Sequence, residues 1–339
     1  MHDLDRGRVV VTGGAGLIGS ALIWGLNRLG VRDILLVDRL DTSEKWKNLV
    51  PLRYRDYVDA DDFEERIGSK PGCFGTVRTT LHLGACSSTT ERDAAYLMRN
   101  NFEYTKHVAS WCVERGIRLV YASSAATYGA LEDHLDDRAD LDSLRPLNMY
   151  AYSKQRFDVY ARDHGLLDRI TGVKYFNVFG PNEHHKGEMR SLVDKAFHQI
   201  REHGSIKLFK SHRPDFRDGE QQRDFLYVKD AVAMTLHLAQ RDAPGIFNIG
   251  SGLAHTWLDL VQPIFTAMNV PQRIEFIDMP ESLRDKYQYH TCANIERLRQ
   301  SGYDAPIMPL DDAVDDYVRN YLIPDRRLDP QAQTAAAVK

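Results

Sequence analysis

A glycine-rich turn constrains this chain more than any other feature. Residues 9–22 read VVVTGGAGLIGSAL, so Gly13, Gly16 and Gly19 lie between a β-branched run and the start of an apolar-periodic helix. A turn without side chains lets the backbone approach a pyrophosphate, and the positive end of the helix faces the anion. The spacing alone is equally typical of an ordinary strand-to-helix turn, but the strand and helix around it favour a dinucleotide site.

A carboxylate follows at the expected distance. Asp38 closes the run DILLVD, 19 residues beyond Gly19, where it can accept hydrogen bonds from the adenosine ribose, as in NAD sites. Arg39 and Lys45 come shortly after it, and two cations there could neutralise the 2′-phosphate of NADP. A solvated charge on a loop is an equally good interpretation of either cation. These residues alone leave NAD versus NADP open.

The order of apolar runs predicts the fold class. Continuous β-branched runs alternate with helical patterns, which indicates a parallel sheet covered on both faces. We therefore expect an α/β chain: a Rossmann-like, doubly wound parallel sheet with a smaller, partly discontinuous C-terminal substrate-binding lobe. The strands are expected at 8–12, 33–38, 117–123, 170–177, 206–209, 224–228 and 245–250, and helices at 17–29, 90–115 and near 187–203.

Two boundaries follow from this pattern. We place a dinucleotide-binding domain at residues 1–176 and a mainly substrate-binding lobe at 177–324, some of whose segments return to the first domain. Residues 325–339 lose hydrophobic patterning and are expected to form a mobile tail. The polar run 211–224 reads as an excursion between two short strands, and long polar excursions often bind ligands.

Composition narrows the classes of partner. The chain has 44 basic and 48 acidic residues, a net charge of −4, so no strong field attracts nucleic acid or an anionic membrane. No apolar stretch resembles a signal sequence or membrane span, and we expect a cytoplasmic protein, with a homo-oligomer as the usual assembly. Four scattered cysteines form neither a disulfide framework nor a zinc spacing; we expect buried thiols.

A tyrosine and a lysine on one helix suggest proton chemistry. In NMYAYSKQRFDVY, Tyr150 lies four residues before Lys154 and so on the same face, whereas Tyr152 points away. Lowering a phenol from a pKa of ~10 to about 7 takes roughly 4 kcal/mol, which a positive charge ~4 Å away supplies at an effective dielectric of 20. Tyr150 is therefore the candidate base, helped by Lys154 and an oxidised nicotinamide.

A small-residue turn after a strand offers hydroxyl groups to the same crevice. In YASSAATYG, residues 121–129, Ser124 is the candidate to orient a substrate hydroxyl, with Ser123 and Thr127 as alternatives. Such serines also commonly satisfy loop backbone, and the tyrosine–lysine spacing occurs by chance on many helices. Their order after a dinucleotide turn is what favours a catalytic role.

The segment PNEHHKGEM, residues 181–189, has three interpretations. His184 and His185 could hold a metal, but only two glutamates lie near them in the sequence, so we predict no metal site. The segment could also be a charged surface loop. The third interpretation is acid–base chemistry by Lys186, which requires desolvation or a nearby positive charge to lower its pKa.

These motifs together resemble the extended short-chain dehydrogenase/reductase superfamily, on TGGAGLIG, ASSAATYG and YAYSK. The resemblance is closer to the ADP-L-glycero-D-manno-heptose 6-epimerases within it. HLGACSSTTERD, RNNFEY, KYFNVFGPNEHHKGEM, RDFLYVKD and DKYQYHT are similar to that family's blocks, and they span most of residues 8–322. GACSSTT and the HKG after NVFGP are the more specific features.

The resemblance implies inversion at C6″ of a nucleotide-linked heptose, supplied to the lipopolysaccharide core, by oxidation and re-reduction with tightly held NADP(H), NAD being possible. It implies Tyr150 and Lys186 as the two acid–base groups, assisted by Lys154 and Ser124. It also implies two sets of binding residues. The cofactor set is Gly13, Gly16, Leu17, Ile18, Gly19, Asp38, Arg39, Lys45, Leu83, Gly84, Ala85, Cys86, Ser87, Asn100, Tyr150, Lys154 and Val178; the substrate set is Ser124, Asn177, Glu188, Lys195, Phe209, Lys210, Ser211, His212, Arg223 and Tyr287.

The chain departs from that family at several positions. Glu188 replaces a small hydroxyl residue, Lys195 a histidine, and Ala60 a lysine that could help hold the NADP phosphate. The excursion at 213–222 is also longer than usual. These departures concern the choice of substrate and the preference for NADP rather than the type of reaction.

Other functions share part of the pattern. A nucleotide-sugar 4-epimerase has the same glycines and tyrosine–lysine pair but does not need Lys186. A 4,6-dehydratase normally has an acidic pair in the serine turn, which SSAATYG lacks. A non-catalytic dinucleotide sensor would keep the phosphate turn without needing tyrosine and lysine on one helical face.

Overall fold

The computed structural model describes residues 3–133, 135–284 and 287–332. Within them, seven parallel strands form one sheet in the order β11-β6-β5-β4-β1-β2-β3. The chain winds outward from β1 in both directions, which confirms the doubly wound sheet and puts the ligand crevice where the order reverses. The strands are β1 (Arg8–Thr12), β2 (Ile34–Asp38), β3 (Asp56–Asp59), β4 (Val77–His82), β5 (Arg118–Ser124), β6 (Thr171–Tyr175) and β11 (Gly245–Ile249).

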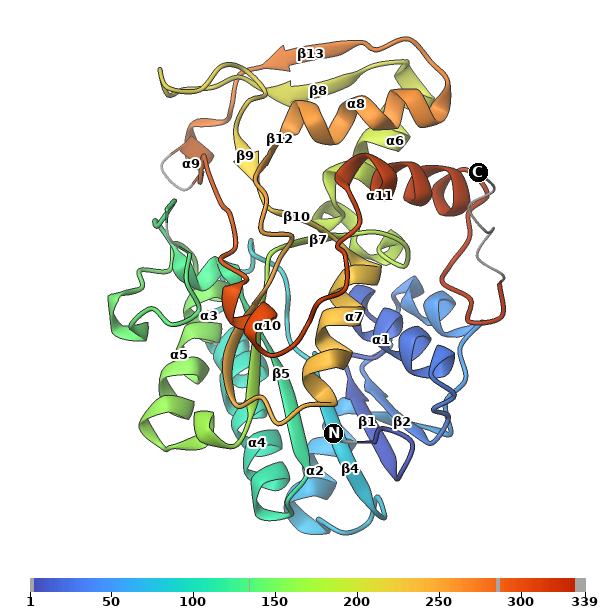
Figure 1. The fold of residues 1–339 in the computed structure, drawn as a ribbon, viewed down its shortest axis with the longest axis vertical. Coiled ribbons are helices and arrows are strands. Elements are labelled where there is room, and N and C mark those ends of the chain that lie inside the picture. The colour runs from blue at the N-terminus through green and yellow to red at the C-terminus, as the bar shows by residue number, and fades with distance from the viewer. Residues whose placement is uncertain (1–2, 134, 285–286, 333–339) are drawn as a thin grey trace.

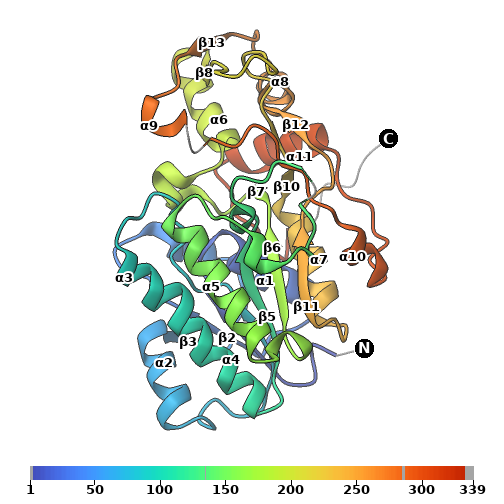
Figure 2. The same cartoon turned by 90° about the vertical axis from the view of Figure 1, so that its left-hand side faces the viewer.

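Helices cover both faces of this sheet, as Figures 1 and 2 show. Successive residues of β1 face opposite sides: Val9 and Val11 pack into the core that includes α1 and α7, whereas Val10 packs with α2 and α4. Burial on both faces explains why the strands read as unbroken apolar runs. The covering helices are α1 (Leu17–Arg28), α2 (Ala60–Ser69), α4 (Tyr104–Glu114), α5 (Met149–Asp163) and α7 (Val228–Ala239).

The helix expected at 90–115 contains an irregular centre. It begins with α3 (Ala94–Leu97), where the Asp93 carboxylate accepts a 2.9 Å hydrogen bond from the N–H of Tyr96. Residues Met98–Glu103 (η2) then form a π-helical turn before α4. Such turns are uncommon and are often found at functional sites.

The smaller lobe lies beyond the carboxyl ends of the sheet strands, at the top of Figure 1. It holds the pair β8 (Ile206–Phe209) and β13 (Ile274–Ile277) and the pair β9 (Gln222–Arg223) and β12 (His255–Thr256). Between it and the large sheet lies a parallel pair formed by β7 (Asn177–Phe179) and β10 (Phe225–Tyr227). Residues 228–249 then return to the large sheet as α7 and β11.

The remaining elements connect these layers. The helices are α6 (Leu192–His203), α8 (Trp257–Met268), α9 (Glu281–Arg284), α10 (Glu296–Gln300) and α11 (Leu310–Tyr317). The short turns are η1 (Glu44–Leu49), η3 (Ala125–Tyr128), η4 (Leu141–Ser143), η5 (Leu166–Asp168), η6 (His184–Met189) and η7 (Val318–Leu322). Of the helices that the structure describes, none has both the length and the apolarity that crossing a bilayer demands.

Two elements differ from expectation near the candidate site. The strand expected at 170–177 divides at Phe176, because β6 belongs to the large sheet while β7 pairs with β10. The helix expected from about 187 begins at Leu192, since the Ser191 hydroxyl accepts a hydrogen bond from Asp194 N–H and caps it there. The preceding residues form the separate turn η6, in which Gly187 has a φ of 53°.

Residues 325–332, the described part of the segment expected to form a mobile tail, contact the rest of the chain. Leu328 is fully buried, and its N–H donates a 3.0 Å hydrogen bond to Oδ1 of Asn182. One apolar side chain and one backbone bond therefore dock this segment without any hydrophobic periodicity. Residues 333–339 lie outside the described residues.

The prediction of buried thiols was wrong for three of the four cysteines. Only Cys112 is buried, on α4 beneath the sheet, while Cys73 is exposed and Cys86 and Cys292 are half-buried. All four are free thiols. Burial of Cys112 raises the pKa of its thiol to about 12.

Candidate active site

The phosphate turn between β1 and α1 fits the backbone of a dinucleotide. Gly13 has a φ of 66°, and a Cβ there would lie 2.8 Å from the backbone nitrogen of Gly84. A Cβ at Gly19 would lie 2.0 Å from the carbonyl oxygen of Gly13. Gly16 is the N-cap of α1 and has no side chain to cover its first N–H groups. Leu17 and Ile18 occupy the first turn, so a bare, positive helix end faces the crevice.

The acid at the end of β2 holds this turn together. Asp38 accepts hydrogen bonds of 2.8 Å from the N–H of Ala15 and from Nζ of Lys45. Arg39 pairs with Asp61 and donates a 2.6 Å bond to Oδ1 of Asn100. Both predicted cations are thus engaged by protein carboxylates rather than solvated on a loop. The departure Ala60 begins α2, next to the Asp61 that holds Arg39.

The segment after β4 lies beside the phosphate turn and beside helix α5. The N–H of Gly84 donates to the Thr12 hydroxyl at 3.0 Å. Asn101, which is fully buried, accepts from the N–H of Cys86 and donates to its carbonyl oxygen and to the Ser153 hydroxyl, at 2.9–3.0 Å. Asn101 therefore fixes residues 83–87 to the helix that carries Tyr150. Our sequence reasoning named Asn100 and missed Asn101; the pair of asparagines in RNNFEY was the only signal.

Tyr150 and Lys154 both lie on α5, and Tyr152 is 43% exposed on the other face, as predicted. Burial raises the pKa of Tyr150, and a hydrogen bond with the Ser124 hydroxyl opposes that shift. Lys154 donates a 2.9 Å bond to the carbonyl oxygen of Ala122, and burial lowers its pKa to about 8. In the chain alone the phenol is thus a weaker acid than we expected, because desolvation outweighs its neighbours.

A buried charge pair supports this helix from behind. Asp158 and Lys174 are 0% and 1% exposed, and their charged atoms lie 3.5 Å apart. Asp158 also accepts hydrogen bonds from Tyr121 and Ser123, at 2.9 and 2.7 Å. Lys174 donates to the Thr127 hydroxyl at 2.7 Å. Ser123 and Thr127, the alternatives to Ser124, therefore belong to this buried network, which leaves Ser124 as the hydroxyl beside Tyr150.

Lys186 lies in the turn η6 above an internal carboxylate. The fully buried Glu183 accepts bonds from the N–H and hydroxyl of Ser191, at 2.6 and 2.7 Å, and so closes the turn against α6. Burial lowers the pKa of Lys186; Glu183 opposes this shift, and the positive charge of Lys195 adds to it. Desolvation and a nearby positive charge, the two features that could lower the pKa of Lys186, thus both act on it. Thr89, in the segment after β4, lies 4.0 Å from Sδ of Met189 in the same turn.

The two family departures near this turn lie beside each other. The Glu188 carboxylate is 3.6 Å from Nζ of Lys195, and the Glu188 side chain is 97% exposed. Such an exposed pair is weak. The two histidines of the segment contact other residues. Nε2 of His184 lies 3.7 Å from the Asp325 carboxylate, and Nδ1 of His185 lies 3.3 Å from Nδ2 of Asn48.

The predicted nucleotide end lies in the smaller lobe. Arg223 is 7% exposed, stacks 5.0 Å above Tyr287 and 5.8 Å above Trp257, and donates to the carbonyl oxygen of Gln222. Burial lowers the pKa of Arg223, and Glu132, the carboxylate whose charge opposes that shift, pairs with Arg213 at 2.7 Å, so the desolvated guanidinium of Arg223 is suited to an anionic ligand. Trp257 was missed by sequence reasoning, since only the pairing of β12 with β9 brings it here.

The other predicted substrate residues occupy this lobe or its border. Phe209 ends β8, and Ser211 N–H bonds the Asp218 carboxylate at 2.7 Å. Lys210 lies 3.3 Å from Asp278, and His212 N–H bonds the Tyr289 hydroxyl at 3.0 Å. Asn177, which is exposed, and Val178 lie in β7 between the two lobes.

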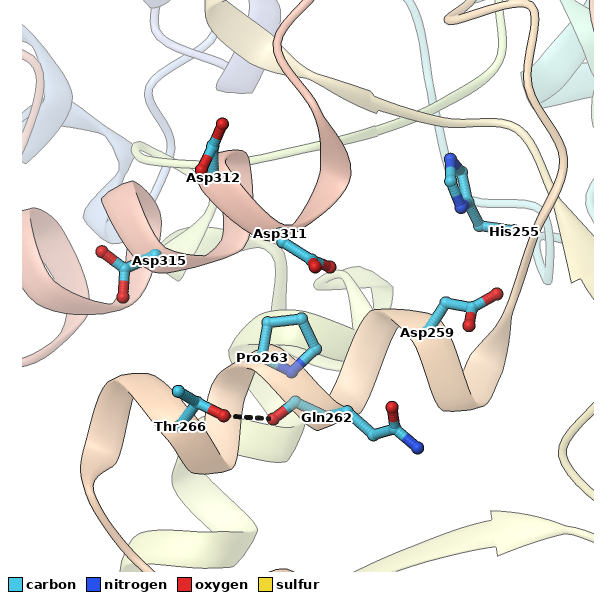
Figure 3. A pocket seen from close by; sticks show the side chains of 8 residues that line it. All are labelled: His255, Asp259, Gln262, Pro263, Thr266, Asp311, Asp312 and Asp315. Carbon is cyan, nitrogen blue, oxygen red and sulfur yellow. Dashed lines mark hydrogen bonds between the residues drawn. The ribbon is translucent and has the colours of Figure 1, made fainter.

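A separate cavity of about 530 Å³ lies between α8 and α11 and contains none of the predicted site residues (Figure 3). Its walls carry Asp311 and Asp315 from α11 and Asp259 from α8. Asp259 caps α8 with Thr256, and Asp315 pairs with Arg319. Asp259 and Asp315 therefore have structural roles, and we do not assign the candidate active site to this cavity.

Comparisons with known proteins agree with this geometry. Residues 9–250 match the NAD dependent epimerase/dehydratase family. An ADP-L-glycero-D-manno-heptose-6-epimerase of Nitratidesulfovibrio vulgaris is 51% identical over 317 residues, covering 92% of this chain and 97% of that protein. One from Fusobacterium nucleatum is 44% identical over 325 residues, covering 93% and 98%.

Solved structures agree in fold. The Helicobacter pylori ADP-L-glycero-D-manno-heptose-6-epimerase superposes with a TM-score of 0.80 at 23% identity, covering 94% of this chain and 98% of that one. A Thermus thermophilus UDP-glucose 4-epimerase in complex with NAD gives a TM-score of 0.71 at 24% identity, covering 92% and 98%. At these identities the likeness extends to the fold alone.

Proposed function

Because the chain belongs to the NAD dependent epimerase/dehydratase family, and within it to the ADP-L-glycero-D-manno-heptose 6-epimerases, we propose that it inverts C6″ of ADP-D-glycero-D-manno-heptose. The product is the L-glycero epimer, without net oxidation. We propose further that the coenzyme is NADP(H) and that the heptose is destined for the lipopolysaccharide core.

One observation carries the proposal. The segment after β4 contacts both the helix of Tyr150, through Asn101 and Ser153, and the turn of Lys186, through Thr89 and Met189. The two elements that carry the proposed acid–base groups thus both contact one segment next to the phosphate turn. A reaction that handles protons on two sides of one carbon requires such a pair, whereas a 4-epimerase does not need Lys186.

The chain's own residues divide the proton transfers. When bound, the dinucleotide would accept a hydride from C6″ and return it to the same carbon. In one epimer the hydroxyl proton goes to Tyr150, and in the other it goes to Lys186, because the two hydroxyl groups point in different directions from the hydride-bearing face. Oxidation would break the C6″–H bond, whose hydride goes to the dinucleotide, and the O–H bond, whose proton goes to one acid–base group. Return of the hydride to the opposite face of the ketone would form the new C–H bond while the other acid–base group protonates the oxygen, so atoms and electrons balance.

Charge placement supports these roles. The cation of Lys154 favours the phenolate form of Tyr150, and Ser124 orients the hydroxyl or ketone oxygen. Burial lowers the pKa of the Lys186 ammonium toward neutral pH, so that the side chain can both take and return a proton. Arg223 and Tyr287 would bind the ADP portion, the diphosphate through the planar guanidinium.

The preference for NADP rests on Arg39 and Lys45. Both flank Asp38, and the Arg39–Asp61 pair is exposed enough to open for a 2′-phosphate, since Asp61 is 70% exposed. Arg39→Ala should then weaken NADP binding at least tenfold more than NAD binding, measured by titration of the coenzyme-free protein. Equal losses for both coenzymes would assign Arg39 to structure instead.

The decisive test is proton NMR of ADP-D-glycero-D-manno-heptose mixed with the purified protein. Formation of the L-glycero epimer supports the proposal. Inertness with this compound, together with turnover of a hexose nucleotide, would reject it. Lys186→Met tests the role of Lys186, and Lys207→Met is its matched control. Lys207 lies on β8, is 57% exposed and pairs with Glu275.

A further inference from the structure

Two buried asparagines connect the turn of Lys186 to the phosphate turn. Asn182 is fully buried, and its Nδ2 donates a 2.9 Å hydrogen bond to the Ser20 hydroxyl on α1. Asn48 is 2% exposed, and its Nδ2 lies 2.9 Å from the carbonyl oxygen of Asn182 and 3.0 Å from that of Ala15. We call Asn48 and Asn182 the asparagine bridge.

Both connections end inside the dinucleotide site. The Ser20 hydroxyl donates at 2.6 Å to the carbonyl oxygen of Gly16, the N-cap of α1. Ala15 lies in the glycine turn itself, and its N–H is held by Asp38. Asn48 therefore bonds the glycine turn directly, and Asn182 reaches it through Ser20. This is the backbone that would face the pyrophosphate.

The other end of the bridge adjoins the catalytic turn. Asn182 precedes Glu183, whose carbonyl oxygen accepts a 2.9 Å bond from the N–H of Lys186. Asn48 also lies 3.3 Å from Nδ1 of His185, the neighbour of Lys186. Asn182 adopts a φ of 81°, a left-handed conformation that asparagine tolerates better than most residues, and its Oδ1 holds the C-terminal segment through Leu328.

We propose that Asn182 is a positioning residue: it sets Lys186 relative to C6″ and transmits occupancy of the phosphate turn to the turn that carries Lys186. The inference rests on the proposed role of Lys186. The two polar groups of the Asn182 side chain bond different segments, Nδ2 the Ser20 hydroxyl on α1 and Oδ1 the N–H of Leu328. A shift of α1 or of the glycine turn is therefore passed directly to η6. Asn182 does not touch the reacting atoms; its effect is on placement.

The test compares Asn182→Gly with Asn269→Gly. Glycine keeps the left-handed backbone at both sites, since Asn269, at the end of α8, has a φ of 55°. Single-turnover formation of reduced nicotinamide is measured separately from each pure epimer. We expect Asn182→Gly to slow the transfer about 10–100-fold from the epimer whose proton goes to Lys186, and less than about twofold from the other. The Asn269 variant should slow neither.

A second readout is independent of turnover. In the wild-type protein, NADP should slow amide hydrogen exchange at residues 183–190, and Asn182→Gly should abolish that protection while NADP still binds. Ser20→Ala, which removes only the hydroxyl partner of Nδ2, should reduce the protection as well. Should Asn182→Gly prove too unstable to purify, Ser20→Ala carries the test alone.

The outcomes separate the two proposals. Equal slowing from both epimers, or unchanged NADP-dependent protection in both variants, would overturn the positioning role. If Lys186→Met slows transfer from neither epimer, the proposed function of Lys186 fails instead, and the exchange experiment still decides whether the asparagine bridge transmits occupancy.

Discussion

Gly19 offers the sharpest test of the phosphate turn. In Gly19→Ala the new Cβ would lie 2.0 Å from the carbonyl oxygen of Gly13, whereas ordinary contact begins at 3.4 Å, so these atoms must separate by a further 1.4 Å. The Gly13 carbonyl also accepts the 3.1 Å bond from Gly16 N–H that forms the turn. It cannot withdraw without breaking that bond and moving the N-terminus of α1.

A displacement of about 1 Å in a preorganised site lowers its reaction rate on the order of 100-fold. We expect a loss of similar size in binding. We therefore expect the dissociation constant for the dinucleotide to rise about 100-fold in Gly19→Ala, equivalent to about 2.7 kcal/mol. The assay is titration of coenzyme-free protein followed by calorimetry or nicotinamide fluorescence.

The matched control is Gly68→Ala on α2. Within the described part of the chain no atom outside its own helix lies within 4 Å of a Cβ at this position. Alanine should leave coenzyme binding unchanged and stabilise the helix by about 0.5–1 kcal/mol. Unchanged affinity in Gly19→Ala, or an equal loss in Gly68→Ala, would refute the reasoning.

Three further substitutions probe the rest of the site. Asp158→Asn leaves the buried Lys174 charge unpaired and should destabilise the protein by about 3–5 kcal/mol in urea unfolding; adding Lys174→Met should recover much of the loss, and no recovery would contradict the pairing. Lys195→Met removes a positive charge that lowers the pKa of Lys186, so the pH–rate limb due to Lys186 should move to higher pH; an unmoved limb would separate the two lysines. Arg223→Leu should raise KM for the nucleotide sugar about 10–100-fold with coenzyme affinity unchanged; a fall confined to kcat would place the guanidinium elsewhere.

The sequence was sufficient wherever a local pattern determines the outcome. The glycine turn, the apolar strand that ends at Asp38 and the orientation of Tyr152 each depend on a short run of neighbouring residues, so periodicity and spacing predict them. The doubly wound sheet followed from the alternation of apolar runs and helices. The candidate Lys186 came from the family resemblance, since no periodicity marks it, and its role stays a prediction.

What escaped prediction depends on contacts between distant segments. Asn182 bonds Ser20, 162 positions earlier, and Leu328, 146 positions later, and neither pairing leaves a mark on the local sequence. The division of the strand at Phe176 likewise arises because β10 competes for its second half. The pKa of Tyr150 was predicted from one charge, whereas desolvation of the whole side chain sets its direction.

The π-helical turn at Met98–Glu103 has a consequence for exchanging parts between relatives. An α-helix turns by about 100° per residue, and the wider π turn absorbs roughly one residue more than an α turn. Within this turn, adjacent asparagines bond different neighbours: Asn100 accepts a hydrogen bond from Arg39, and Asn101 accepts one from the N–H of Cys86. A chimera whose corresponding helix lacks the extra residue would rotate one asparagine away from its partner, and so loosen the contact either with Arg39 or with Cys86.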